Sequence, residues 1–173
     1  QIRDNIFANA YVDITFLKDF KFTANFTLDN VYTNVTYFSN NEYGTAADPS
    51  WNGIVEKISG NYTSINTQQL LSYRKTFDSK HTVDALIGHE FSKDSDSSVD
   101  AYKLNIFYPG IPELGNAIEA YGDGATSETV KSAIEGYFFR GNYSYDDRYS
   151  ASVSYRYDGT SQFAYSQWGH FWS

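Results

Sequence analysis

The chain has no cysteine, no methionine and only three prolines among its 173 residues. Without cysteine it can form neither a disulfide framework nor a thiolate metal site. Its formal net charge of -8 argues against nucleic acid as a partner, because nucleic acid requires a basic face. No uninterrupted apolar stretch reaches the roughly 18 residues that a transmembrane helix needs. These absences exclude a disulfide scaffold, a nucleic-acid binder and a helical membrane protein.

Aromatic residues are abundant instead, making up 18% of the chain with 16 Tyr and 13 Phe. Many of them belong to stretches in which every second residue is apolar. Between residues 6 and 16, and again between 20 and 28, the even positions are apolar and the odd positions are mostly polar. A period of two places one face of a β-strand against an apolar phase and the other against water. Two such strands of about ten residues, joined by a short turn, are typical of a transmembrane β-hairpin.

The same pattern, followed along the chain, predicts an all-β antiparallel meander of six strands, at residues 5–17, 20–38, 54–74, 81–91, 132–145 and 149–158. Their connections alternate between short turns and long loops, and the long loops cover about 39–53 and 92–131. A structureless loop as long as the second is unusual in a compact soluble domain. Alternating turns and loops are the pattern of an outer-membrane barrel, which has tight periplasmic turns and longer extracellular loops. We therefore predict part of a larger transmembrane β-barrel.

Charged residues indicate which face of the predicted strands meets lipid. Arg140 and Arg156 alternate with apolar neighbours, and an arginine facing lipid at the midplane costs about 2–4 kcal/mol. We expect both to face the lumen with Asp13 and Asn25, while the lipid-facing set includes Val12, Phe22, Phe26, Ala151 and Val153. Aromatic residues near both ends of the strands would form the two interfacial girdles. Alternation alone also fits a soluble β-sandwich binding module, which is the weaker alternative.

Catalytic and metal-binding motifs are poor. The three histidines are widely spaced and form no ligand pair, and no set of nucleophile, base and orienting group is visible. We expect no enzyme, no cofactor and no metal site. The candidates for substrate binding or lid docking are Trp51, Tyr102, Tyr108, Tyr121 and Asp158. Aromatic rings flanked by carboxylates and amides suit carbohydrate, although loops of this kind can also cover a partner or the pore mouth.

Several segments near the C-terminal end form an ordered series. Tyr-Phe-Phe-Arg-Gly-Asn-Tyr begins at residue 137, Asp-Asp-Arg-Tyr at 146, Arg-Tyr-Asp-Gly-Thr-Ser-Gln-Phe at 156 and Trp-Gly-His-Phe at 168. This series resembles the barrel of SusC/RagA-type TonB-linked outer-membrane proteins, and residues 70–77, 85–90 and 10–12 with 17–20 also resemble its strands. The departures are Gln162, where the family usually has Arg, and Trp172, where it usually has Pro. No role of that arginine is therefore carried over.

The resemblance implies that residues 1–173 are part of a TonB-dependent-receptor-like barrel in the Gram-negative outer membrane, with no plug domain among them. Six strands cannot close so large a barrel, and lipid does not tolerate open sheet edges, so we expect a segment of a larger protein. The implied partners are outer-membrane lipid, the rest of the barrel and its plug, TonB through another region, and a SusD-like lipoprotein. The implied function is import of oligosaccharides or peptides. A passive porin-like or structural barrel is the alternative.

Overall fold

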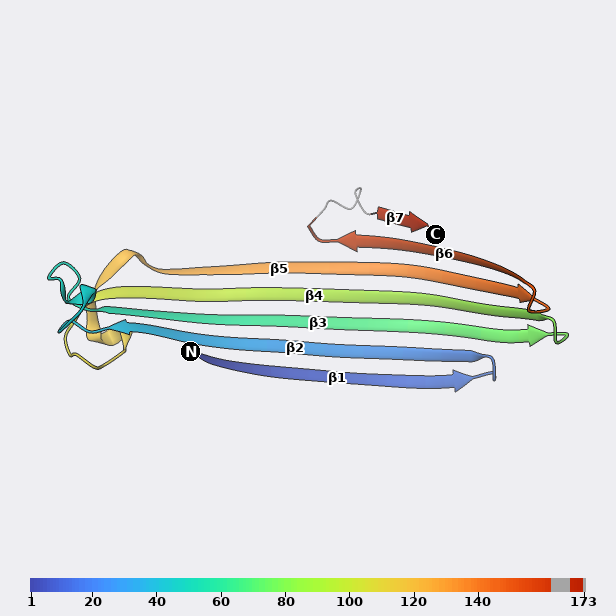
Figure 1. The fold of residues 1–173 in the computed structure, drawn as a ribbon, viewed down its shortest axis with the longest axis horizontal. Coiled ribbons are helices and arrows are strands. Elements are labelled where there is room, and N and C mark those ends of the chain that lie inside the picture. The colour runs from blue at the N-terminus through green and yellow to red at the C-terminus, as the bar shows by residue number, and fades with distance from the viewer. Residues whose placement is uncertain (163–168, 173) are drawn as a thin grey trace. The chain divides into compact units, whose positions relative to one another are not determined.

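The chain forms a β-sheet in a computed structural model that describes residues 1–162 and 169–172. Within these residues seven strands are hydrogen-bonded in chain order, and neighbouring strands run in opposite directions (Figure 1). They are β1 (Ile2–Phe16), β2 (Phe20–Ser39), β3 (Ile54–Phe77), β4 (His81–Ile106), β5 (Ala117–Tyr145), β6 (Tyr149–Thr160) and β7 (Gly169–Trp172). Two short 3-10 helices, η1 (Thr45–Ala47) and η2 (Leu114–Asn116), lie in the connections. The predicted all-β antiparallel meander is confirmed.

Strand β7 is absent from the six strands that the sequence predicts. It pairs antiparallel with β6, so that Tyr155 lies opposite Trp172 and Asp158 opposite Gly169. Phe163 and Trp168, which belong to the ordered series of motifs, lie outside the described residues. Among the residues that are described, no helix is both long enough and apolar enough to cross a membrane.

Three short turns join β1 to β2, β3 to β4 and β5 to β6. Each contains two consecutive residues with positive φ, which are Leu17 and Lys18, Asp78 and Ser79, and Asp146 and Asp147. In the second and third turns, Lys80 N donates to Phe77 O at 3.1 Å and Arg148 N to Tyr145 O at 3.0 Å, which with two positive φ angles is typical of the type I′ turn, whose twist matches that of the strands it connects. The first turn is bonded to β3, because Arg74 N donates to Asp19 O at 2.9 Å, and the third turn is bonded to the second, because Asp146 N donates to Lys80 O at 2.7 Å. These three turns lie at one end of the sheet (Figure 1).

The second long loop is much shorter than predicted. Strand β4 continues to Ile106 and β5 begins at Ala117, so the connection covers residues 107–116 rather than 92–131. The prediction is wrong because it equates polarity with irregular structure. The segment is rich in Ser, Asp and Glu, yet backbone hydrogen bonds to neighbouring strands hold a sheet together without an apolar face. The first long connection covers residues 40–53, close to the predicted 39–53.

The sheet divides into two compact units. The loop unit consists of Gln1–Ile6, Asn30–Thr63 and Ser95–Val130, and the turn unit of Phe7–Asp29, Ser64–Asp94 and Lys131–Ser173. The loop unit has a small core of Val55, Ile106 and Ala117, against which Phe38 and Leu114 pack. The 107–116 connection closes over this core. Asn116 holds the connection in place, because its Nδ2 donates to Tyr108 O at 2.8 Å and to Ile111 O at 3.0 Å.

The turn unit has two chemically distinct faces. The register of β5 and β6 places aromatic residues opposite aromatic residues on one face. There Tyr137 lies opposite Tyr157, Phe139 opposite Tyr155 and Tyr145 opposite Tyr149. On the other face the register aligns Arg140 with Ser154, Asn142 with Ser152 and Ser144 with Ser150. Aromatic contacts continue the first face near the short turns, where the Phe20 ring lies 5.5 Å from Phe16 and 4.7 Å from Tyr73. Alternation along the strands thus produces one aromatic face and one polar face.

Candidate functional site

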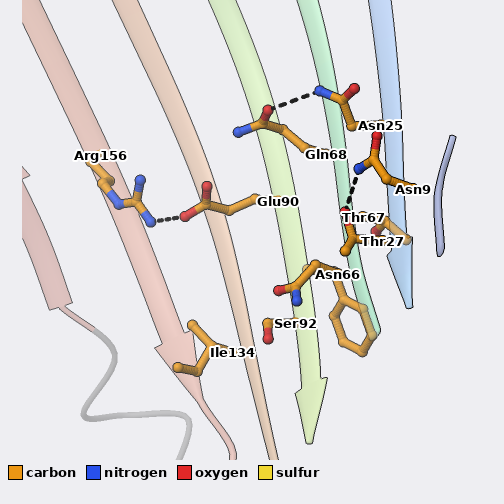
Figure 2. A pocket seen from close by; sticks show the side chains of 11 residues that line it. Asn9, Asn25, Thr27, Asn66, Thr67, Gln68, Glu90, Ser92, Ile134 and Arg156 are labelled. Atoms are coloured by element: carbon orange, nitrogen blue, oxygen red, sulfur yellow. Dashed lines mark hydrogen bonds and ion pairs between the residues drawn. The ribbon is translucent and has the colours of Figure 1, made fainter. Parts of the chain in front are cut away.

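A groove in the turn unit is lined mainly by polar side chains that point toward one another (Figure 2). Its volume is about 620 Å³. The lining residues are Asn9 on β1, Asn25 and Thr27 on β2, Asn66, Thr67 and Gln68 on β3, Glu90, Phe91 and Ser92 on β4, Ile134 on β5 and Arg156 on β6. Amide, hydroxyl and charged groups dominate, so this polar groove can exchange hydrogen bonds with a polar solute.

Cross-strand hydrogen bonds arrange the amides of the polar groove. Asn9 Nδ2 donates to Thr27 Oγ1 at 2.8 Å, and Asn25 Nδ2 donates to Gln68 Oε1 at 3.4 Å. Each bond joins neighbouring strands at positions that alternation places on the polar face. A carboxamide has two N–H donors and a carbonyl acceptor, so one such bond does not use its full capacity. The wall of the groove is therefore ordered and still able to bind.

Arg156 is the centre of a charged cluster in the polar groove. Its Nε donates to Asp158 Oδ1 at 2.8 Å and to Oδ2 at 2.7 Å, and its guanidinium forms an ion pair with Glu90. The guanidinium carbon also lies 5.6 Å from the centre of the Phe138 ring, within the range of a cation–π contact. Two carboxylates around one guanidinium give the cluster a net negative charge.

Two glycines provide the space that this cluster occupies. A Cβ at Gly88 would overlap the Phe138 ring. A Cβ at Gly136 would lie 2.5 Å from Asp158 Oδ1 and 3.3 Å from Glu90 Cγ. Glycine inside a strand often marks such a close approach. Gly88 and Gly136 are therefore required by the packing on the polar face rather than by their own backbone angles.

The loop unit contains a second site, which is a cluster of three aromatic rings. Tyr121 stacks on Trp51 with ring centres 5.9 Å apart and an interplanar angle of 23°, and its ring centre lies 5.0 Å from that of Tyr102. Burial, together with the charge of Glu56, raises the pKa of Tyr102 above its usual value. Trp51 and Tyr121 remain 37% and 53% exposed, so this aromatic cluster presents open ring surface.

Backbone bonds to the end of β4 position Trp51. Asn105 N donates to Trp51 O at 3.0 Å, and Ile106 N donates to Asn52 O at 2.9 Å. Asn52 and Asn105 both have positive φ, which Asn tolerates better than most residues, and their side chains hydrogen-bond to each other at 2.6 Å. Just before Trp51, Asp48 Oδ1 accepts hydrogen bonds from the Ser50 hydroxyl at 2.6 Å and the Ser50 N–H at 2.9 Å, and these bonds lower the pKa of Asp48.

Comparisons with known proteins agree with this geometry. No family model matches the chain. It is 28% identical over 113 residues to TonB-dependent receptor P39 of Formosa agariphila, an alignment that covers 64% of this chain and 11% of that protein. It superposes on the RagAB peptide transporter with a TM-score of 0.80 at 21% identity, and on the RagAB peptide importer in its open-open state with a TM-score of 0.76. The predicted resemblance to a SusC/RagA-type barrel is confirmed.

The chain corresponds to only a part of these proteins, since the two superpositions cover 98% of it but 19% of the matched chain. As a barrel segment it needs one face toward lipid and one toward the lumen. The polar groove and the charged cluster belong to the face that suits a lumen, because arginine and carboxylates are costly in lipid. The aromatic face, which carries Tyr137, Phe139 and Val153, suits lipid.

The structure brings three of the five predicted site residues together. Trp51, Tyr102 and Tyr121 form the aromatic cluster. Tyr108 lies on the 107–116 connection, 66% exposed, with its backbone N–H bonded to Asn116 Oδ1 at 3.0 Å. Asp158 belongs to the turn unit, where it binds Arg156. A ligand-binding role for any of the five stays a prediction.

The sequence does not mark the residues of the polar groove as a site. Asn9, Asn25, Gln68 and Glu90 come from four strands and become neighbours only through the register of the sheet. The available signal was chemical, because amide and charged residues recur at alternate positions that face away from the aromatic side. Within the described part of the chain, no group of three or more His, Asp or Glu side chains could hold a metal ion.

Proposed function

We propose that this chain is a wall segment of a TonB-dependent transporter in the Gram-negative outer membrane, which imports peptides or oligosaccharides together with a SusD-like lipoprotein. The observation that carries the proposal is the polar groove on a face opposite the aromatic face, in a chain that shares its fold with the RagAB peptide transporter. A channel that conducts polar solutes needs such a wall on its inner side.

The chemistry of the polar groove fits solutes rich in amide or hydroxyl groups. Asn and Gln side chains both donate and accept hydrogen bonds, and they can replace the water that a peptide or sugar loses on entry. Thr27 and Ser92 add hydroxyl groups, and Glu90 with Arg156 adds charge. This mixture suits transient contacts with several solutes rather than tight binding of a single one.

We expect the aromatic cluster to contact the same solutes. Sugar C–H faces and apolar peptide side chains both pack on exposed rings. Trp51 and Tyr121 come from different segments and hold their rings nearly parallel at an angle of 23°. Such a surface can bind a solute through its open ring faces.

The remaining partners follow from the barrel. The aromatic face contacts outer-membrane lipid, and the open edges of β1 and β7 pair with the rest of the barrel. A wide barrel stays selective only when a plug fills it, so release of solute requires TonB acting through another region of the protein. The lipoprotein would dock on the extracellular loops, for which the 107–116 connection is the candidate surface.

Uptake measurements in the whole protein test the proposal. We expect uptake of a peptide or oligosaccharide to stop when TonB is deleted, and uptake that persists would favour a passive pore. Replacing both Trp51 and Tyr121 with Ala should weaken solute binding roughly tenfold or more. Each aromatic contact contributes a free energy of about 0.5–1.5 kcal/mol beyond the burial of its area. The matched control is Tyr43→Ala, an exposed aromatic residue of the same 40–53 connection, which should leave binding unchanged.

A further inference from the structure

Four polar side chains interrupt the aromatic face of the turn unit. His89 Nδ1 lies 2.7 Å from Gln69 Oε1, and His89 Nε2 lies 3.0 Å from Glu135 Oε1. The Tyr137 hydroxyl donates to the same Glu135 oxygen at 2.7 Å, and the Tyr137 ring centre lies 4.7 Å from that of His89. We call Gln69, His89, Glu135 and Tyr137 the His89 cluster.

Strand alternation places the His89 cluster on the face that suits lipid. His89 shares its face of β4 with Ile87, and Glu135 shares its face of β5 with Tyr137 and Phe139. The polar groove uses the opposite positions, such as Glu90. An ionisable pair facing the centre of a bilayer is unfavourable by several kcal/mol. The His89 cluster therefore has to lie at a border of the apolar band.

A similar group of side chains lies next to the short turns. His81 Nδ1 is 2.7 Å from the Tyr143 hydroxyl, and the His81 ring centre is 4.9 Å from that of Tyr145. Between the two histidines the same face carries Ile87, Phe139 and Val153, which are 57%, 37% and 51% exposed. A histidine paired with tyrosine thus flanks the apolar stretch on each side.

The spacing of the two groups agrees with the thickness of a membrane. His81 and His89 are separated by eight residues of β4, as are Tyr145 and Tyr137 in β5. Eight residues at about 3.4 Å each span roughly 27 Å along a strand. Barrel strands tilt by about 35–45°, which reduces this height to roughly 20 Å, close to the apolar band of about 25 Å in outer-membrane barrels.

We propose that the His89 cluster contacts lipid headgroups at the extracellular border of the membrane, and that His81 with Tyr143 and Tyr145 marks the periplasmic border. His89 and Glu135 satisfy each other while their side chains stay 33% and 34% exposed. They can therefore form hydrogen bonds to headgroups without leaving an unpaired polar group in hydrocarbon. The proposal depends on the barrel fold and not on transport, so it survives if the proposed function fails.

Spin labels on single cysteines test the two proposed borders in the full-length protein, reconstituted in phosphatidylcholine vesicles. The measurement compares how often each label collides with oxygen and with a water-soluble nickel complex. This segment has no cysteine of its own. At Ile87→Cys and Val153→Cys we expect collisions with oxygen to exceed those with a water-soluble nickel complex several-fold. At Ala133→Cys, one step beyond Glu135 on the same face, and at the polar-face control Ser152→Cys, we expect the reverse. The proposal is overturned if Ala133 behaves like Val153, or if Val153 is shielded from both reagents by protein.

A double variant tests whether the His89 cluster itself sets the border. Replacing His89 and Glu135 with Leu should extend the apolar band and raise the oxygen-to-nickel ratio at Ala133→Cys several-fold. His81→Leu, which alters the other border, should leave that ratio unchanged. An unchanged ratio in the double variant would show that the cluster does not define the border. If the double variant does not assemble, the four labels in the unaltered background still decide where the border lies.

Discussion

The two units of this sheet are stabilised in different ways. Every buried hydrophobic side chain among the described residues lies in the loop unit, and these are Ala46, Val55, Leu104, Ile106 and Ala117. The turn unit has none of them, although its strands are rich in Phe, Tyr, Ile and Val. The loop unit thus has a small packed core of its own, although other apolar side chains in it, such as Tyr43, Phe107 and Ile118, remain exposed.

The difference shows that apolar side chains on the same strands can be covered in two different ways. In the turn unit the large apolar side chains stay exposed. Under the proposed function lipid covers them, and their transfer from water to lipid would supply the stabilisation. In the loop unit the connections provide cover, since Leu114 of the 107–116 connection packs against the core and Ala46 of the 40–53 connection is buried. Mutations in the turn unit should therefore change stability through contact with lipid, and mutations in the loop unit through packing of its core.

The largest expected effect comes from a charge on the aromatic face. Val153, 51% exposed, lies opposite Gly141 on that face. In the whole protein, Val153→Arg should cost about 2–4 kcal/mol at the midplane and prevent assembly. The adjacent Ser152→Arg points to the polar face and should assemble normally. The fraction of heat-modifiable protein in outer membranes measures both, and equal assembly of the two variants would refute the assigned faces.

A cavity in the loop unit should have the next largest effect. Val55 is fully buried against Ile106 and Ala117, so Val55→Ala should cost about 2 kcal/mol locally. Hydrogen exchange in residues 40–53 and 107–116 should accelerate by a factor of roughly 30, because each 1.4 kcal/mol is tenfold. Val99→Ala, at a position 51% exposed in the same unit, is the control. Equal acceleration in both variants would contradict a local core.

A smaller effect is expected where glycine makes room for the charged cluster. Gly136→Ala brings a Cβ within 2.5 Å of Asp158 Oδ1, and the carboxylate can move only by loosening its bonds to Arg156. Overpacking of this kind costs about 1 kcal/mol or more, which should lower the thermal stability of the detergent-solubilised protein. Gly60→Ala, whose Cβ would meet nothing nearer than 4.0 Å, should not. Equal melting temperatures for Gly136→Ala and Gly60→Ala would argue against close packing of the charged cluster on Gly136.

The smallest effect concerns acid sensitivity of the 40–53 connection. Hydrogen bonds from the Ser50 hydroxyl and N–H lower the pKa of Asp48 from its ordinary value. A lowered pKa means that the bond stabilises the fold above the ordinary Asp range and is lost as pH falls through the folded value. Ser50→Ala should raise the pKa of Asp48, so that hydrogen exchange in residues 48–53 increases at a higher pH than in the unaltered protein. Ser50→Thr, which keeps the hydroxyl, should not move this onset.

Much of the turn unit could be predicted from the sequence, because alternation there is strict and the turns are short. The loop unit could not be predicted as well. Strand β4 continues to Ile106 through Ser95, Asp96 and Ser97, and this polar stretch has no apolar periodicity that would mark a strand. In such a segment the partner strands decide the structure, and a single sequence does not display them.

The aromatic cluster shows the same limit for the site. The sequence predicts a binding role for Trp51, Tyr102 and Tyr121 from their chemistry. The contact between their rings depends on the positive φ angles of Asn52, in the 40–53 connection, and Asn105, at the end of β4. The charged cluster depends in turn on the pairing of β5 with β6, which places Gly136 opposite Asp158. The chemistry of a site residue could be predicted from the sequence, whereas the residues that it contacts are determined by the pairing of the strands.

The tight turns have a consequence for how this protein can change during evolution. Because the period of a strand is two, a shift in register of one residue exchanges its faces and would turn Arg140 and Arg156 toward lipid. The type I′ turns at residues 77–80 and 145–148 leave no slack to absorb an added residue. Insertions and deletions should therefore be rare at these turns in related proteins, and length variation should concentrate in the 40–53 and 107–116 connections, where new specificity can arise without disturbing the wall.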